Sequence, residues 1–168
     1  MAASNQENNP ESAGRKPTKS QLESSATKPA PCKIRPDSIP QELKDRNQWV
    51  LWAYRRRKGK WTKVPYQPGA EEARADDPST WTRFDHVVKH GRFVRGSYDG
   101  IGYEFSADDP YTGIDLDDSI DPETNKLKPW AQAIVGSLNS YTEKSPSGTG
   151  VKIWVKARKP SNDRSRTK

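Results

Sequence analysis

The stretch Gly113-Ile114-Asp115-Leu116-Asp117-Asp118 alternates small or apolar residues with carboxylates. Successive side chains of a strand point to opposite faces, so Asp115 and Asp117 are predicted to project together from one face. Ile114 and Leu116 then anchor the opposite face. Two carboxylates held by one strand are the hard oxygen ligands that Mg²⁺ or Mn²⁺ prefers. The stretch therefore predicts a divalent-cation site on a strand.

Two other interpretations of this acidic cluster are a solvated turn and a calcium loop. A solvated turn is the less favoured, because the strand that leads into the cluster is predicted to be buried, and aiming carboxylates from a buried strand costs free energy unless cations or donors meet them. An EF-hand is suggested by acidic or hydroxyl residues at alternate positions, namely Asp115, Asp117, Ser119 and Asp121. It fails because Ile120 stands where the turn needs glycine and Lys126 stands where a bidentate glutamate is needed.

A second motif, Ser145-Pro146-Ser147-Gly148-Thr149-Gly150, follows further along the chain. Its proline and glycines allow a tight turn, and Ser147 and Thr149 offer hydroxyls beside exposed amides. Lys152 comes next on a predicted strand, where its ammonium either reaches a phosphate or faces solvent. Such a turn complements the phosphates of a metal-held nucleotide. The two motifs together predict phosphoryl or nucleotidyl transfer.

Composition limits the class of protein. The 168 residues carry a net charge of +7, a pI near 9.5 and a mean hydropathy of −1.10, which favours an anionic partner such as nucleic acid. Cys32 is the only cysteine, so a disulfide framework and a cysteine-based zinc site are both excluded. No apolar run resembles a signal peptide or a membrane span. We therefore expect a cytoplasmic protein with no membrane partner.

The chain divides into three predicted parts. Residues 1–37 are polar, contain almost no large apolar residues and are expected to form a disordered tail. Residues 38–157 hold the clustered apolar residues and are expected to form one domain. Residues 158–168 are expected to be a disordered basic tail.

Periodicity within the domain predicts an α+β fold with a mixed, largely antiparallel sheet and a few helices. The expected elements are a hairpin of strands 48–54 and 61–66, a helix over 81–89 with Thr80 as its N-cap, a second hairpin of strands 100–105 and 111–117, a helix opened by Pro129 and ended by Asn139-Ser140, and a last strand over 151–156.

Basic side chains gather around the turn of the first hairpin and are predicted to bind nucleic acid: Arg55, Arg56, Arg57, Lys58, Lys60 and Lys63. Trp49, Trp52 and Trp61 are interleaved with them and would allow base stacking. The same residues are also explained by a solvated turn beside core tryptophans.

Taken in order, these motifs resemble the primase-polymerase (Prim-Pol) domain of the archaeo-eukaryotic primase superfamily, which occurs at the N-terminus of phage and plasmid replication proteins. The resemblance runs from about Ile39 to Val155 and is carried by Gln48-Trp49-Val50, Lys63-Val64-Pro65-Tyr66, the Trp81 helix, Tyr98-Asp99-Gly100-Ile101-Gly102, Gly113-Ile114-Asp115-Leu116-Asp117, Trp130-Ala131 and the 145–151 segment. It implies a DNA primase/polymerase that adds nucleotides on a DNA template, with nucleoside triphosphates and Mg²⁺ or Mn²⁺, in phage or plasmid replication. It also suggests a replicative helicase as a partner.

The resemblance assigns roles to particular residues. The family's Asp-x-Asp motif binds the catalytic metal ions and matches Asp115 and Asp117. Its Ser-Gly-x-Gly-x-His motif binds the nucleotide's phosphates and corresponds to Ser147, Gly148, Thr149 and Gly150, with Lys152 at the histidine position. A permanent charge thus replaces an imidazole that can be neutral.

The family's third motif, an acidic residue on a later strand, is expected beyond the end of this chain. The domain is therefore expected to be incomplete at its C-terminal end, with open strand edges and impaired catalysis. Asp163 lies in the polar tail and is a poor substitute for this third acidic residue. Glu104 can take its place only if the second hairpin brings it close to Asp115 and Asp117. Two alternatives follow, namely an inactive nucleotide- or DNA-binding remnant and a metal-dependent nuclease.

Overall fold

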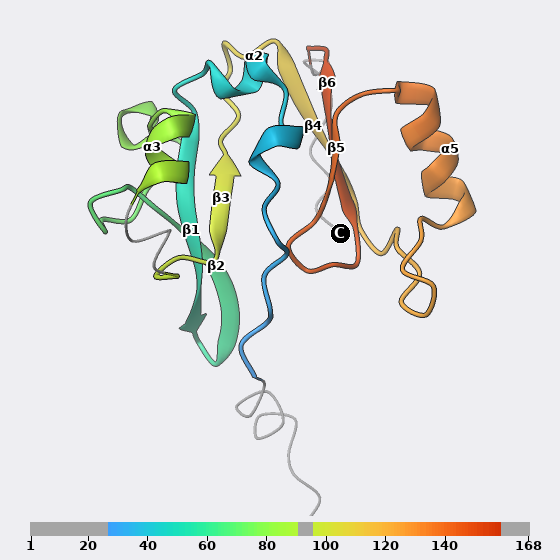
Figure 1. Cartoon of the computed structure of the whole chain (residues 1–168), viewed down its shortest axis with the longest axis horizontal. Helices are drawn as coiled ribbons and strands as arrows, with labels where there is room; N and C mark the ends of the chain where they lie inside the picture. Colours follow the sequence, from blue (N-terminus) through green and yellow to red (C-terminus); the bar gives the residue numbers. More distant parts are fainter. Residues whose placement is uncertain (1–26, 91–95, 159–168) are drawn as a thin grey trace, which may run out of the picture.

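The computed structural model describes residues 27–90 and 96–158 (Figure 1). Its elements, in chain order, are η1 (Pro36–Ser38), α2 (Gln41–Lys44), β1 (Trp49–Arg57), β2 (Lys60–Tyr66), η2 (Pro78–Thr80), α3 (Phe84–Lys89), β3 (Gly100–Tyr103), β4 (Tyr111–Leu116), α5 (Pro129–Leu138), β5 (Thr142–Lys144) and β6 (Val151–Lys156). The strands of these described segments form two antiparallel sheets, with orders β2-β1-β3 and β4-β6-β5. The predicted α+β class is confirmed.

The first sheet is built on the predicted β1–β2 hairpin, which is confirmed. Arg57 pairs with Lys60, so the turn consists of Lys58 and Gly59. Their φ angles are +49° and +79°. Positive φ at both central residues is typical of the two-residue turns that match the twist of antiparallel strands, and a glycine adopts it without strain.

The core lies on the face of β1 that carries Trp49, Leu51 and Ala53, all of which are buried. Val87 of α3 belongs to the same cluster and is fully buried. The tryptophan ring also meets Phe84 edge-on, with 4.9 Å between ring centroids. The packing of β1 side chains against α3 side chains therefore fixes the helix on one face of this sheet.

Helix α3 begins later than the sequence pattern predicts, and the prediction of Thr80 as its N-cap is wrong. Thr80 instead ends the short helix η2. Thr82 is extended and forms a backbone bridge with Trp49, with N···O distances of 2.8 and 2.9 Å. Because this bridge holds the chain against β1, helical geometry starts only at Phe84.

The predicted second hairpin is wrong, because its two strands lie in different sheets. β3 pairs with β1, whereas β4 pairs with β6. Asp109, in the connection between them, has a fully buried side chain that accepts hydrogen bonds from Gln48 Nε2 (2.8 Å) and the Tyr103 hydroxyl (2.7 Å). These long-range contacts hold the connection at the end of the first sheet, before the chain enters β4 of the second sheet.

The second sheet pairs β4 with β6 and β6 with β5. Helix α5 lies beside it, on the side away from the first sheet (Figure 1). Ala131 of this helix is fully buried, whereas Leu138 is partly exposed. The helix ends at Asn139, which adopts a left-handed φ of 42°. The predicted helix and the predicted last strand are both confirmed.

The two sheets share one buried core, because Tyr111 and Trp154 of the second sheet belong to the cluster that contains Trp49 and Leu51. The chain that leads to η1 runs between the sheets (Figure 1). Cys32 Sγ lies 3.5 Å from the carbonyl oxygen of Ser145.

The predicted tails lie mostly outside the described residues. Residues 1–26 and 159–168 are not described. Lys28, within the predicted 1–37 tail, pairs with Asp99 at 2.8 Å. None of the helices in 27–90 and 96–158 has the length and apolar character that crossing a bilayer requires.

Candidate metal and nucleotide site

The predicted metal ligands lie at the end of β4. Asp115 is on the strand with about half of its side chain exposed, and Asp117 follows directly after the last strand residue and is exposed. On the other face of the strand, Ile114 pairs with the fully buried Ile153. The alternation read from the sequence therefore holds, and it directs the carboxylates away from the apolar face.

The chain after Asp117 is held by its own hydrogen bonds. The hydroxyl of the buried Ser119 donates to the Leu116 carbonyl oxygen (2.8 Å). Asp121 accepts from the backbone N–H groups of Glu123 and Thr124 (both 2.9 Å), and the bonds to Thr124 lower the pKa of this carboxyl. Asp121 thus closes a turn of its own.

The predicted phosphate turn is organised by Ser145, which sequence reasoning did not single out. Its backbone N–H donates to the Gly150 carbonyl (2.8 Å), its carbonyl accepts from Gly148 (2.8 Å), and its hydroxyl accepts from Gly150 N–H (3.2 Å). Gly148 has a φ of +79°. Ser147 and Thr149 are exposed, with their hydroxyl oxygens 3.1 Å apart. Both residues are therefore accessible to a ligand, and the Ser147 hydroxyl also lies 2.8 Å from the Ser145 hydroxyl.

The two motifs are packed directly on each other. The Ile120 N–H donates to the Thr149 carbonyl (2.9 Å). A Cβ atom at Gly150 would lie 2.6 Å from the Leu116 carbonyl oxygen and 3.4 Å from the Cα of Asp117. Only glycine permits this approach, so the phosphate turn rests against the end of the acidic strand.

Lys152 forms an ion pair with a predicted metal ligand. It stands opposite Asp115 in the β4–β6 register, with its Nζ 2.7 Å from Asp115 Oδ2. The lysine side chain is 35% exposed and the aspartate side chain 49%. A charge-assisted bond of this length gives the carboxylate a counterion within the protein. The predicted contact between Lys152 and a phosphate stays a prediction.

Glu143 is a second acidic neighbour of Lys152, which sequence reasoning missed. It pairs with Lys152 across β5 and β6, so Asp115, Lys152 and Glu143 form a row on one face of the sheet. The Tyr141 hydroxyl donates to Glu143 Oε2 (3.1 Å). Burial raises the pKa of Glu143, and this hydrogen bond and the nearby lysine charge oppose the rise. Only knowledge of the β5–β6 register would have revealed the row.

Lys63 of β2 faces this row from the first sheet. Burial lowers the pKa of Lys63, and the charge of Lys152 lowers it further, whereas Asp115 and Glu143 oppose the shift. Lys63, one of the predicted nucleic-acid contacts, is therefore coupled electrostatically to Asp115, Lys152 and Glu143.

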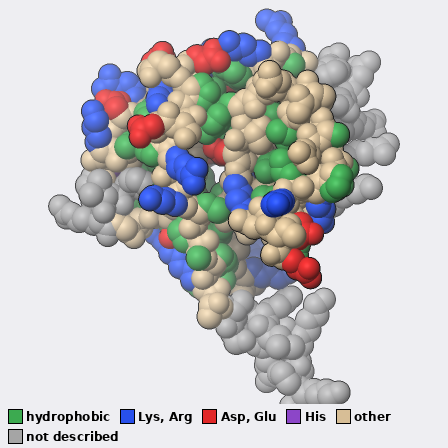
Figure 2. Space-filling model, turned by 45° about the vertical axis from the view of Figure 1, so that its right-hand side comes forward, with side chains coloured by type: hydrophobic (Ala, Val, Ile, Leu, Met, Phe, Trp, Pro, Cys, Tyr) green, Lys and Arg blue, Asp and Glu red, His purple; other side chains and the backbone are tan. Residues whose placement is uncertain are grey.

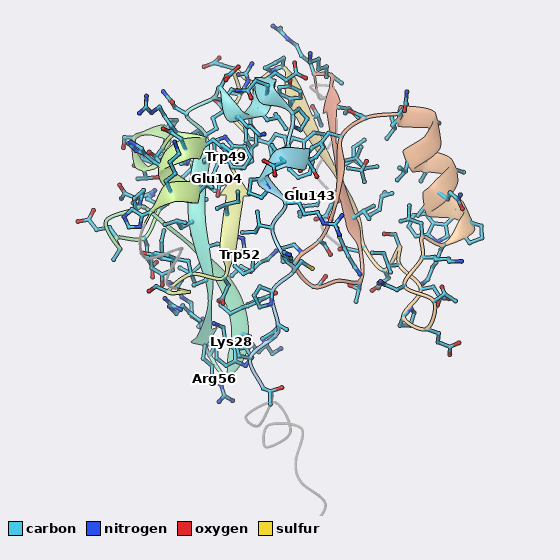
Figure 3. All side chains as sticks on the ribbon, viewed as in Figure 1. Lys28, Trp49, Trp52, Arg56, Glu104 and Glu143 are labelled. Atoms are coloured by element: carbon cyan, nitrogen blue, oxygen red, sulfur yellow. The ribbon has the colours of Figure 1, made fainter. Side chains whose placement is uncertain are left out.

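The other predicted nucleic-acid contacts lie along the hairpin. The Arg55 guanidinium lies over the Tyr66 ring, and Arg57 pairs with Glu72 at 2.5 Å. Lys58 and Lys60 are exposed at the turn. Figure 3 shows Arg56 near the tip of the hairpin, far from Glu143 in that view.

Two of the three tryptophans near this hairpin are core residues. Trp49 and Trp52 are buried, and their indole N–H groups donate to the carbonyl oxygens of Leu43 (2.9 Å) and Ile101 (3.0 Å). A buried, hydrogen-bonded indole cannot stack on a base, so the core interpretation is confirmed for both.

A groove of about 1120 Å³ opens beside Asp115. Its lining includes Phe105, Asp115, Lys152 and Arg158. Phe105 is 38% exposed and stacks on Trp154, with 5.9 Å between ring centroids. Figure 2 shows several Lys and Arg side chains beside a hollow near the middle of the visible face.

The donor set at this site is two carboxylates. Within residues 27–90 and 96–158, no three His, Cys, Asp or Glu side chains come together to hold a metal ion. The route predicted for Glu104 is wrong, since β3 and β4 do not form a hairpin, and Asp163 lies outside the described residues. Two carboxylates fit Mg²⁺ or Mn²⁺, which take one or two protein carboxylates and complete their coordination with phosphate and water.

The chain was compared with known proteins, and one curated protein is similar to it. No protein-family model matches the chain. A curated protein of Nitratiruptor phage NrS-1, named DNA Primase-polymerase, is 34% identical over 122 residues, which make up 72% of this chain. The chain spans 16% of the length of that phage protein. Identity at this level over most of the chain, together with an acidic strand and a glycine turn in contact, shows that the chain belongs to the primase-polymerase family.

Proposed function

We propose that this chain is the metal- and nucleotide-binding part of a DNA primase-polymerase, a nucleotidyltransferase that extends a DNA primer. The observation that carries the proposal is the packing of Gly150 on Leu116, which joins the phosphate turn to the end of the acidic strand. A metal–triphosphate complex needs carboxylates and phosphate donors within a few ångströms of each other.

The proposal gives each side chain a chemical task. Asp115 and Asp117 hold Mg²⁺ or Mn²⁺, which when bound neutralises phosphate charge and favours attack by a primer 3′-hydroxyl. Ser147 and Thr149 donate hydroxyl hydrogen bonds to the triphosphate, and Gly148 and Gly150 let the backbone approach it. Lys152 and Lys63 supply positive charge beside the phosphates.

The proposal places a DNA strand along the basic side chains of the hairpin. Lys58 and Lys60 are exposed at the tip, where Arg56 also lies, and they offer contacts to the phosphate backbone. The Arg55 guanidinium lies over the Tyr66 ring and Arg57 pairs with Glu72, and both add positive charge to the same hairpin. We place this activity in phage or plasmid DNA replication in the cytoplasm, with a replicative helicase as partner.

One observation favours the second candidate, a nucleotide- or DNA-binding remnant without turnover. The described residues bring only two carboxylates to the site, and one of them already carries the Lys152 counterion. A two-metal displacement normally relies on a larger acidic set.

Primer extension tests the proposal. The full chain is incubated with a primed DNA template, deoxynucleoside triphosphates and Mg²⁺ or Mn²⁺, beside Asp115→Asn and a matched control, Asp118→Asn. The control changes an exposed neighbouring carboxylate whose φ of +49° suits asparagine. Product that is lost in Asp115→Asn and kept in the control supports the enzyme. Nucleotide binding without product supports the remnant, and strand cleavage without nucleotides indicates a nuclease.

A further inference from the structure

We propose that Lys152 is a built-in counterion for Asp115 that only a metal–triphosphate complex displaces easily, so that the site takes metal and nucleotide together. The inference rests on the proposed function and adds to it a coupling between the two ligands. Its physical basis is the ion pair between Lys152 Nζ and Asp115 Oδ2, at 2.7 Å.

The ammonium occupies the place that a cation would take at Asp115. A divalent cation bound to the same carboxylate would lie within about 4 Å of the ammonium, where like charges repel strongly. Metal binding therefore requires Lys152 to leave Asp115. A metal ion that arrives alone must replace the ion pair and brings no anion of its own for the lysine, which is left with Glu143 alone.

A triphosphate offers the displaced ammonium a new partner. Lys152 lies two residues after Gly150, on the strand that emerges from the phosphate turn. Phosphate oxygens held by Ser147 and Thr149 would lie near this ammonium and accept charge-assisted hydrogen bonds. The loss of the aspartate contact is then compensated, and the two ligands bind with positive coupling.

Neighbouring charges also act on Lys152 and influence its choice between Asp115 and a triphosphate. Glu143 stands on the other side of Lys152 in the strand register, and the ammonium of Lys63 faces both from β2. Asp115 and Glu143 thus attract Lys152 from both sides. The positive charge of Lys63 offsets part of this attraction. A histidine at this position would supply a counterion only when protonated.

Two binding measurements on the full chain separate this role from simpler ones. The first titrates Mn²⁺ alone and follows it by electron paramagnetic resonance. The second titrates the Mn²⁺ complex of a non-hydrolysable α,β-imido analogue of deoxyadenosine triphosphate. The variant is Lys152→Met, with Lys152→Gln as a second variant in case the methionine disturbs packing.

Opposite changes are expected for the two probes. Because partly exposed ion pairs are weak, Lys152→Met should bind Mn²⁺ alone about three- to fivefold more tightly, and it should bind the metal–analogue complex at least threefold more weakly. Lys156→Met is the matched control. Lys156 lies on the same face of β6 and pairs with Glu42 at 2.5 Å, and its loss should change neither affinity.

The other outcomes overturn the inference. Weaker binding of both probes in both Lys152 variants would mean a structural role. Unchanged Mn²⁺ affinity with weaker analogue binding would make Lys152 a simple phosphate ligand; if Asp115→Asn still abolishes Mn²⁺ binding, the proposed function survives that result. A wild-type chain that binds neither probe would refute both the inference and the proposed function.

Discussion

Replacing Gly150 by alanine should destabilise the protein through one backbone contact. The new Cβ would lie 2.6 Å from the Leu116 carbonyl oxygen, well inside ordinary contact distance. Neither side can yield easily, because that oxygen accepts from Ser119 and both backbone groups of Gly150 bond to Ser145. Overpacking of this kind costs about 1–3 kcal/mol, and we expect a loss of that size in the free energy of unfolding.

Urea unfolding, followed by tryptophan fluorescence, measures this loss as a shift of the transition midpoint at constant slope. Gly136→Ala is the matched control, because a Cβ there meets nothing within 4 Å and the residue lies inside helix α5. It should stabilise the protein by about 0.5–1 kcal/mol. Gly148→Ala meets no backbone within 4 Å but has a φ of +79°, and should cost about 1–2 kcal/mol from strain alone.

A Gly150→Ala protein as stable as the wild type, measured beside a stabilised Gly136→Ala, would refute the close packing of the phosphate turn on β4. The physical link between the two motifs would then be lost, and with it the observation that carries the proposed function.

Three further changes test the core and the connection between the sheets. Leu51→Ala, at a fully buried position, should lower the free energy of unfolding by about 2–5 kcal/mol in the same urea experiment, and a loss below 1 kcal/mol would contradict the core assignment. Asp109→Ala should cost about 1–3 kcal/mol by removing the buried carboxylate that accepts from Gln48 Nε2 and the Tyr103 hydroxyl, and an unchanged midpoint would mean that these bonds do not stabilise the connection. Burial raises the pKa of Glu104, so the carboxyl contributes stability below its unfolded pKa and loses it as pH rises through its folded pKa. Glu104→Gln should therefore be more stable than the wild type at pH 7, with the advantage fading toward pH 4, and a difference that does not change with pH would rule this out.

The local elements were predictable because their signals are local. The Lys58-Gly59 turn, the proline that opens α5 and the alternation in β4 each depend on neighbouring residues. The two chemical motifs were also visible, since an acidic strand and a glycine turn are written in short runs of sequence. Their mutual contact follows from the β4–β6 pairing, which brings Leu116 opposite Val151.

The features that the sequence did not reveal depend on pairing between distant segments. The connection 104–110 has the length and polarity of a hairpin loop. Asp109 nevertheless accepts a hydrogen bond from Gln48, and β4 pairs in a different sheet from β3. The row of Asp115, Lys152 and Glu143 exists only in the register of three strands. Tertiary pairing overrode the local signal in the first case and created the charge arrangement in the second.

The most direct measurement is the binding of Mn²⁺ together with the deoxyadenosine triphosphate analogue to the full chain, recorded by electron paramagnetic resonance. We expect the wild-type protein and Asp118→Asn to bind the complex, and the double variant Asp115→Asn/Asp117→Asn to lose at least tenfold in affinity while keeping its urea midpoint. Equal binding by the double variant and the wild type would contradict the assignment of the acidic strand as the metal and nucleotide site.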